Sequence, residues 1–147
     1  TNDAASGMIR LLDMGVDDFL LASTVTGILA QRLMRRLCDH CKQAYEPPQE
    51  LIEELALQAL IEREGGGFYA AKGCEYCGDT GYKGRVAMLE FLSVSETIKK
   101  QVMAKSGAVE INKSALAEGM MSMLSDGLQK AARGLTTLEE VVRLTKK

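Results

Sequence analysis

Two short cysteine motifs, Cys38-Asp39-His40-Cys41 and Cys74-Glu75-Tyr76-Cys77, organise the middle of this chain. Each C-x-x-C motif bends into a tight knuckle that presents two thiolates, and residues 42–73 separate the two knuckles. Four thiolates form the ligand set of closed structural zinc sites, in which no position is left open for catalysis. The pattern therefore predicts one structural zinc ion, held by Cys38, Cys41, Cys74 and Cys77.

Other uses of the four cysteines stay open at this point: two disulfides, four free thiols, an iron site or a reactive redox pair. Disulfides are disfavoured because no secretory signal segment opens the chain, and the cytosol keeps thiols reduced. His40 could replace one thiolate, but it lies inside the first knuckle beside Cys41, so the all-cysteine set is favoured. We expect three nearby lysines to offset the thiolate charge: Lys42, Lys72 and Lys83.

The composition is that of an ordinary globular domain. The chain has 147 residues, of which 46% are apolar and 26% charged, and its net charge is -2. This balance disfavours nucleic-acid binding, which needs a strongly basic surface. No apolar stretch approaches the roughly 20 residues that span a bilayer, so we predict no transmembrane segment. The chain opens on Thr1-Asn2-Asp3 without a start Met, from which we expect a piece of a longer protein.

The sequence also argues against catalysis by this chain alone. A phosphate loop of the G-x-x-x-x-G-K-[ST] kind needs a Gly-Lys pair, and the sequence contains none. His40 is the single histidine, which disfavours a histidine-based triad or a histidine-rich catalytic metal site. We therefore expect no catalytic residues and no organic cofactor.

Capping residues and hydrophobic periodicity predict the N-terminal elements. One helix is expected over residues 4–13, and a second is expected to start at Asp17 or Asp18 and to run towards Thr24. Residues 28–37 allow either a helix or a strand, because their leucines recur every four residues and also share one strand face.

The remaining elements are expected to be mostly helical. Between the knuckles, residues 49–64 predict a single helix, and Glu46–Gly66 carries a local charge of -5, which is typical of a solvated face. Arg85–Leu92 reads as a strand. The later helices are expected over 97–104, after a Ser93/Glu96 capping box; over 108–132, with a break near Gly119 or Gly127; and after a Thr136/Glu139 capping box.

Four ordered motifs carry a resemblance to a known family. They are TNDAASGMIRLLDMGVDDFLLAS at 1–23, AQRLMRRLC-x-x-C at 30–41, C-x-x-C followed by GYKGR at 74–85, and DGLQKAARGLTTLEEVVRLT at 126–145. In these motifs the chain resembles the C-terminal part of bacterial secretion-type ATPases, the motors of type II secretion and type IV pilus assembly. The resemblance leaves out Glu46–Gly73. It also departs from the family at Val86 and Ala87, where threonine or isoleucine often follows the arginine.

The resemblance implies that the parent protein is a homohexameric ATPase. In that family the phosphate loop, the acidic metal-binding motifs and the histidine motif precede the Thr1-Asn2-Asp3 segment, so only the full-length parent would bind ATP and Mg. Retraction-type motors lack the cysteine module, which favours the assembly and secretion branch. The expected partners are neighbouring ring subunits and cytoplasmic or inner-membrane components of the machine. The expected location is the bacterial cytoplasm, peripherally at the inner-membrane face.

The resemblance also favours a strand at 28–37 and so completes the expected fold. We predict an α+β, mostly helical class: a short antiparallel strand pair with an inserted tetracysteine zinc module, followed by a C-terminal helical bundle. Residues 1–37 would be a remnant of the ATPase C-terminal lobe, 38–81 the zinc module with its inserted helix, and 82–147 a strand and a helical subdomain.

Four arginines near the knuckles are candidates for contacts with a neighbouring subunit or another partner: Arg32, Arg35, Arg36 and Arg85. Arginine gives planar, bidentate contacts to carboxylates and phosphates. The alternative is a solvated strand face with local pairs to Asp39 or Glu90.

Two functions from different classes follow. The first is a noncatalytic, zinc-stapled fragment of an assembly motor, which packs against ring subunits and transmits ATP-driven motion to the export or pilus machine. The second is an independent cysteine-based redox or metal-relay module. Tight metal retention with inert thiols supports the first, and facile disulfide exchange supports the second.

Overall fold

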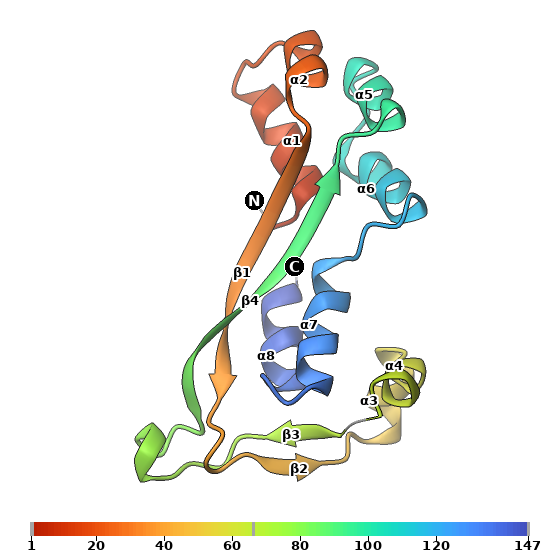
Figure 1. Ribbon diagram of the computed structural model, residues 1–147. Helices are drawn as coiled ribbons and strands as arrows, with labels where there is room; N and C mark the ends of the chain where they lie inside the picture. The colour runs from red at the N-terminus through yellow and green to blue at the C-terminus, as the bar shows by residue number, and fades with distance from the viewer. Residues whose placement is uncertain (1, 66, 147) are drawn as a thin grey trace. The chain divides into compact units, whose positions relative to one another are not determined.

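A computed structural model describes residues 2–65 and 67–146 (Figure 1). In chain order its elements are α1 (Ala4–Asp13), α2 (Asp18–Thr24), β1 (Gly27–Leu37), β2 (Gln43–Tyr45), α3 (Gln49–Glu54), α4 (Gln58–Glu64), β3 (Phe68–Ala70), the 3-10 turn η1 (Glu75–Cys77), β4 (Tyr82–Ser93), α5 (Glu96–Met103), α6 (Ala108–Ala117), α7 (Met123–Ala132) and α8 (Leu138–Thr145). The α+β, mostly helical class predicted from the sequence is confirmed.

The chain folds into two compact units, and each is built from two separate stretches. The first unit combines the residues up to Gln31 with Leu89–Met123, and the second combines Arg32–Met88 with the residues from Leu124 onward. The helices that follow β4 are therefore shared: α5 and α6 belong to the first unit, whereas nearly all of α7 and the whole of α8 belong to the second.

Strands β1 and β4 pair as a two-stranded antiparallel sheet. At one end of the pair the Val94 amide donates to the Thr26 carbonyl, and at the other the Cys38 amide donates to the Gly81 carbonyl, each at 3.0 Å. Residues 28–37 are thus a strand, as the family resemblance implied. Everything between Cys38 and Gly81 is inserted into this strand pair.

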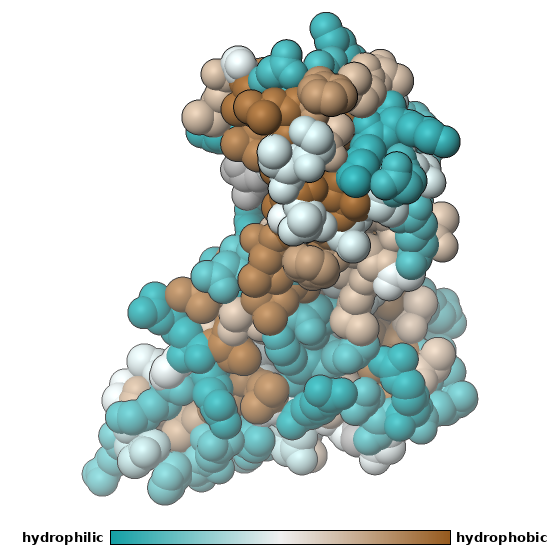
Figure 2. Space-filling model, turned by 45° about the horizontal axis from the view of Figure 1, so that its top comes forward, coloured by the Kyte–Doolittle hydropathy of each residue, from teal (hydrophilic) through white to brown (hydrophobic). Residues whose placement is uncertain are grey.

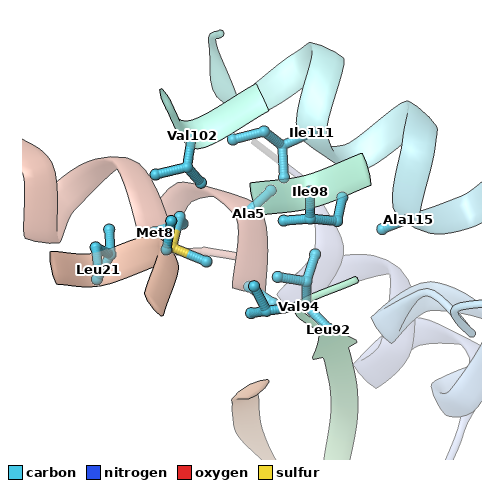
Figure 3. Close-up of a cluster of buried hydrophobic side chains, with 11 residues drawn as sticks. Ala5, Met8, Leu21, Leu92, Val94, Ile98, Val102, Ile111 and Ala115 are labelled. Carbon is cyan, nitrogen blue, oxygen red and sulfur yellow. The ribbon is translucent and has the colours of Figure 1, made fainter. Parts of the chain in front are cut away.

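The core of the first unit lies among four helices and the end of β4. Helix α1 packs on α6, α2 packs on α5, and α5 packs on α6. Figure 3 shows buried side chains from each of these elements meeting in one cluster, among them Met8, Leu21, Leu92, Ile98 and Ile111. The bounds predicted for α1 and α2 are confirmed.

A buried glutamate of β4 holds the starts of two helices in the first unit. Glu90 is 4% exposed, and its Oε1 accepts from the amide of Ala4, the first residue of α1, at 3.0 Å. Its Oε2 accepts from the amide of Met123, the first residue of α7, at 2.9 Å. The carboxylate thus satisfies helix N-terminal donors that have no partner within their own helices.

In the second unit, β2 and β3 form an antiparallel pair in which Ala44 lies opposite Tyr69. Helices α3 and α4 connect these two strands (Figure 1). The prediction of one continuous helix over 49–64 was wrong. Ala56 has a positive φ of 52°, which an α-helix cannot contain, and the chain turns there between two short helices.

Two N-cap predictions were wrong, because a residue further along the chain caps each helix. Ser95, rather than Ser93, caps α5 and accepts from the Ile98 amide at 3.3 Å. Thr137, rather than Thr136, caps α8, because the Thr136 hydroxyl donates instead to the Arg35 carbonyl at 2.8 Å.

The predicted break in the long helix occurs near Gly119, whose φ is 102°. Gly127 lies inside α7, where it allows a close approach of other elements. A Cβ added at Gly127 would lie 2.6 Å from Met88 Sδ and 2.8 Å from Val141 Cγ1. Across the described residues, none of the helices is long and apolar enough to cross a membrane.

Candidate metal centre

The first knuckle begins where β1 ends. Cys38 directly follows the strand, and its carbonyl accepts from the amides of Cys41 at 3.4 Å and Lys42 at 3.1 Å. These bonds close a turn that brings the Cys38 and Cys41 side chains to the same side of the backbone. The strand pair therefore fixes the position of the first two thiols.

The second knuckle uses η1 and permissive glycines. Cys74 precedes this turn and Cys77 ends it, and the Asp79 amide donates to the Cys74 carbonyl at 2.8 Å. Gly73 has a φ of 115°, and a Cβ there would lie 2.8 Å from the Asp79 carbonyl oxygen. Gly81 is also constrained, because its Cβ would lie 2.6 Å from Ala71 Cβ.

The two knuckles bring all four sulfur atoms together. The four Sγ atoms lie within 4.8 Å of one another. The Cys38–Cys74, Cys41–Cys77 and Cys74–Cys77 Sγ separations are 3.8, 3.9 and 3.8 Å. Tetrahedral coordination with metal–sulfur bonds of about 2.3 Å requires sulfur atoms about 3.8 Å apart. These separations far exceed the roughly 2.05 Å of a disulfide bond, and the four cysteines are free.

Backbone amides point at the sulfur atoms. Cys77 Sγ accepts from the Cys74 amide at 3.3 Å and from the Gly81 amide at 3.2 Å, and Cys41 Sγ accepts from the Gly73 amide at 3.3 Å. Such donors stabilise thiolates, which is the form that binds metal. The donor set therefore suits a soft cation with four thiolate ligands.

The environment also divides the acidities of two thiols. Burial, together with hydrogen bonds from the other thiols, raises the pKa of Cys41 to about 11 against the opposing effect of the Gly73 amide. Burial also acts to raise the pKa of Cys77, but the amides of Cys74 and Gly81 and the neighbouring thiols outweigh it and lower this pKa to about 6. Of these two thiols, Cys77 is therefore the more acidic.

The cluster fits the structural metal that its spacing predicted. Cys38 and Cys77 are buried, Cys41 and Cys74 are partly buried, and together they supply a complete tetrahedral sulfur set. When bound, a zinc ion would supply four strong bonds that tie the end of β1 to the start of β4, and it would leave no coordination position for a substrate.

His40 lies outside this cluster, as the sequence indicated. Its ring stacks on that of Tyr76, with the centroids 3.9 Å apart, so the two knuckles also touch through their exposed tips. Lys83 Nζ lies 4.6 Å above the same Tyr76 ring.

Two of the three lysines near the knuckles donate hydrogen bonds to backbone carbonyls, and the expected offset of thiolate charge stays a prediction. Lys42 donates to the Gly134 carbonyl at 3.0 Å, and Lys83 donates to the Tyr76 carbonyl at 3.1 Å. Sequence reasoning missed the backbone amides that face the thiols. The signal that could have found them is the placement of glycine at Gly73 and Gly81.

The arginine candidates are distributed along the strand pair. Arg32 donates to the Leu144 carbonyl in α8. Arg36 lies 3.8 Å from the exposed carboxylate of Asp39, the local pair weighed as the alternative. Arg85 is exposed. Contacts of these side chains with another subunit stay a prediction.

Arg35 binds the buried carboxylate of Glu140. Glu140 of α8 is 1% exposed, and its carboxylate accepts from the Arg35 backbone amide at 3.0 Å and from Arg35 Nη2 at 2.7 Å. Arg143 Nη2 donates to both carboxylate oxygens at 3.0 Å. Burial alone would raise the pKa of Glu140, but these donors outweigh it and lower the pKa below its ordinary value. The Arg35 guanidinium also lies 4.1 Å above the Tyr82 ring.

Comparison with known proteins agrees with this architecture. Residues 1–143 match the family model described as type II/IV secretion system protein. The chain is 45% identical to the type IV pilus assembly ATPase PilB of Thermus thermophilus over 99% of its own length and 16% of that relative. It is also 45% identical to the type II secretion system protein E of Xanthomonas campestris pv. campestris, over 99% of its own length and 25% of that relative.

A third relative, the type IV pilus assembly ATPase PilB of Pseudomonas aeruginosa, is 42% identical over 99% of this chain and 25% of its own length. The chain thus spans about a quarter or less of each of these relatives. Pilus-assembly and secretion proteins match it equally well, so identity does not separate the two branches. The chain belongs to the type II/IV secretion system protein family.

Proposed function

We propose that this chain is a noncatalytic part of a type II secretion or type IV pilus-assembly motor, stapled by one structural zinc ion. One observation carries the proposal: four cysteine Sγ atoms from two knuckles lie within 4.8 Å of one another in a chain of this family. A tetrahedral site with all positions filled stabilises a fold and does not bind substrate.

The staple would act where the inserted module meets the strand pair. Cys38 follows β1, and Cys77 lies five residues before Tyr82, the first residue of β4. Cys38 and Cys74 are 36 residues apart in sequence, so bringing them together costs the chain the conformational entropy of loop closure. Bonds to the metal would offset that cost. With the metal bound, the strand pair and the module would move as one body.

The chain would use that rigidity within a larger machine. We propose that it packs against neighbouring subunits of a homohexameric ring and passes ATP-driven motion to cytoplasmic or inner-membrane components at the inner-membrane face. Support comes from relatives named as assembly and secretion ATPases. The proposed domains are a remnant of the ATPase C-terminal lobe at 1–37, the zinc module at 38–81, and a strand with a helical subdomain at 82–147.

Hydrolysis is assigned to the full-length parent and not to this chain. The sequence contains no Gly-Lys pair with which to build a phosphate loop, and its four cysteines are committed to the metal. ATP and Mg would bind to the rest of the parent. We expect the isolated chain to show no ATPase activity above a buffer blank.

The decisive experiment measures metal content and thiol reactivity together. The chain is purified without added metal, its zinc and iron are quantified, and its thiols are titrated before and after chelation. We expect close to one zinc per chain, with four thiols that react only after the metal is removed. Iron in place of zinc would change the identity of the staple.

The same experiment decides against the redox or metal-relay alternative. The thiolate character of Cys77, whose pKa is about 6, is the feature that would suit disulfide exchange. Absence of metal together with rapid exchange with oxidised glutathione would overturn the structural-zinc proposal. Retained metal and unreactive thiols would support it.

A further inference from the structure

The second unit contains a pocket that the metal centre does not use. It has a volume of about 550 Å³ and lies between the β2–β3 pair and helix α8. Pockets of roughly 300 to 1,000 Å³ hold ligands the size of one or two large side chains or a small molecule. Its walls are mainly aromatic and aliphatic: Tyr45, Leu51, Tyr69, Tyr82, Leu138 and Val142.

The floor of this pocket is fixed. The Tyr82 hydroxyl lies 3.0 Å from Thr137 Oγ1, and the Arg35 guanidinium lies over the ring of Tyr82, 4.1 Å from its centroid. Tyr69 is held by Lys42, whose Nζ lies 4.8 Å above its ring. Tyr45 stays 38% exposed at the opening. A preorganised apolar floor with an exposed aromatic at its rim is the arrangement that anchors a hydrophobic side chain.

The charged rim specifies the rest of the ligand. Arg143 and Lys146, in the last turn and at the C-cap of α8, line the pocket, as does Glu139. Arg143 still exposes 57% of its side chain although it binds Glu140. Two cations against one rim carboxylate favour a ligand in which acidic groups adjoin an apolar anchor.

The chain carries one such segment in its first unit. At the start of α2, Asp17 and Asp18 directly precede Phe19 and Leu20, which are 67% and 53% exposed. The Asp17 carboxylate accepts from the Leu20 amide at 3.0 Å, and the Asp18 carboxylate accepts from the Phe19 amide at 2.8 Å. Acidic and apolar groups are therefore held together in one helical turn.

Figure 2 shows hydrophobic residues, in brown, exposed at the surface among hydrophilic residues, in teal. Phe19 is a large aromatic side chain that is mostly exposed, and it directly follows two acids. Val109 is equally exposed, but it is smaller and follows an alanine. An exposed aromatic in a short acidic turn fits a protein contact better than it fits water.

We infer that the pocket beside α8 binds the α2 turn of a second copy of this chain, with Phe19 and Leu20 in the aromatic pocket and Asp17 and Asp18 facing Arg143 and Lys146. The inference rests on the proposed packing between subunits and names the two surfaces that make it. Because the donor turn and the acceptor pocket are different surfaces, each copy both gives and receives one contact. Directional contacts of this type build rings when the rotation closes.

Sedimentation equilibrium of the metal-loaded chain, from micromolar to millimolar concentration, tests the contact. We expect reversible self-association that Phe19→Ser in the donor and Tyr45→Ser in the acceptor each weaken by about tenfold or more. Asp13→Lys and Lys113→Glu are matched charge reversals on exposed helical positions outside both surfaces, and they should leave association unchanged. Circular dichroism melts and metal content establish that each variant is folded.

Mixing gives the sharper test. A Phe19→Ser chain keeps its pocket, and a Tyr45→Ser chain keeps its α2 turn, so an equimolar mixture should regain one contact and form dimers that neither variant forms alone. Combining Asp18→Lys with Lys146→Glu in one chain should restore association that each reversal weakens, because the charges are complementary again.

Two results would overturn the inference. If none of the donor and acceptor variants changes the strength of self-association, the interface lies elsewhere. The proposals of subunit packing and of a structural zinc ion would then still stand. A wild-type chain that stays monomeric at millimolar concentration, with metal bound and the fold intact, would exclude this contact and leave the structural-zinc proposal unaffected.

Discussion

Glu140 of α8 accepts hydrogen bonds from both the backbone amide and the guanidinium of Arg35 in β1, across 105 residues of sequence. A carboxylate that is 1% exposed needs such partners, because burial of an unpaired charge costs several kcal/mol. The pair therefore fixes the last helix of the chain against the strand that leads into the metal centre.

Replacing Glu140 by Gln should destabilise the chain. The amide group keeps one acceptor oxygen but turns an NH2 group towards arginine donors. Because the Arg35 and Arg143 side chains are 55% and 57% exposed, solvent offsets part of the loss, and we expect about 1 to 3 kcal/mol in urea unfolding. Arg36→Gln, which removes only the exposed 3.8 Å pair with Asp39, should cost about 0.5 kcal/mol or less.

The same pair predicts a pH dependence. Its donors lower the folded-state pKa of Glu140 below 4.5, so the unfolded state binds more protons as the pH falls. The stabilisation is fully present above pH 4.5 and is lost as the pH falls through the folded pKa. The difference in unfolding free energy between wild type and Glu140→Gln should therefore shrink with acidification. A difference that grew in acid would contradict the assignment.

Replacing Cys77 by Ser should abolish stoichiometric metal binding. If apparent zinc binding of about 10 to 16 kcal/mol is shared by four ligands, one ligand contributes roughly 3 kcal/mol. Cys77 Sγ also accepts two amide hydrogen bonds, which a hydroxyl would rearrange. We expect a large fall in melting temperature and less than one metal per chain by elemental analysis.

His40→Ala is the matched control for that experiment. His40 lies in a knuckle but only stacks on Tyr76, outside the sulfur cluster. This variant should keep one metal per chain and lose little stability. Metal loss from His40→Ala, or full retention in Cys77→Ser, would show that the ligand set differs from the four cysteines.

Glu90→Gln tests the shared cap in the first unit. A glutamine side chain has one oxygen, so it cannot accept from both the Ala4 and Met123 amides as the carboxylate does. We expect about 1 to 3 kcal/mol of destabilisation and faster hydrogen exchange at one of these two amides. Glu96→Gln is the control, because it makes the same substitution at a side chain that is 83% exposed. Its unfolding free energy and its hydrogen exchange at the Ala4 and Met123 amides should stay near those of the wild type.

Gly127→Ala should destabilise the second unit although alanine is the better helix former. The new Cβ would lie 2.6 Å from Met88 Sδ and 2.8 Å from Val141 Cγ1, so these side chains or their elements must shift, at about 1 to 3 kcal/mol net of the helix-propensity gain. Gly67→Ala, which lies outside the helices and where no atom lies within 4 Å of the new Cβ, should change the unfolding free energy by about 0.5 kcal/mol or less. Equal melting temperatures for the two variants would argue against close packing at Gly127.

Local rules account for the elements that the sequence predicted well. Asp3 and Asp17 cap α1 and α2 through bonds to the amides three residues later, so the start of each helix is encoded within one turn. The clustering of the four cysteines could also be predicted from the sequence, because C-x-x-C spacing fixes the geometry of each knuckle. Family resemblance was needed for β1, whose leucines satisfy both periodicities.

The errors occurred where a distant partner decided a local choice. Thr136 was a reasonable cap, but its hydroxyl donates to the Arg35 carbonyl 101 residues away, and Thr137 caps the helix instead. The break at Ala56 was missed for another reason, because no glycine or proline lies beside this residue to indicate a turn.

The starts of α1 and α2, the four clustered thiols and the family of this protein can be inferred without a structure, because they depend on residues a few positions apart or on ordered motifs. The packed chain was needed to see that Glu90 binds the starts of two helices, that Glu140 binds Arg35 and that backbone amides face the sulfur atoms. The Glu90 and Glu140 contacts join segments distant in sequence, and so does the bond from the Gly73 amide to Cys41 Sγ. A buried polar group takes whichever partner the packed chain brings within hydrogen-bonding distance, and no local pattern records that partner.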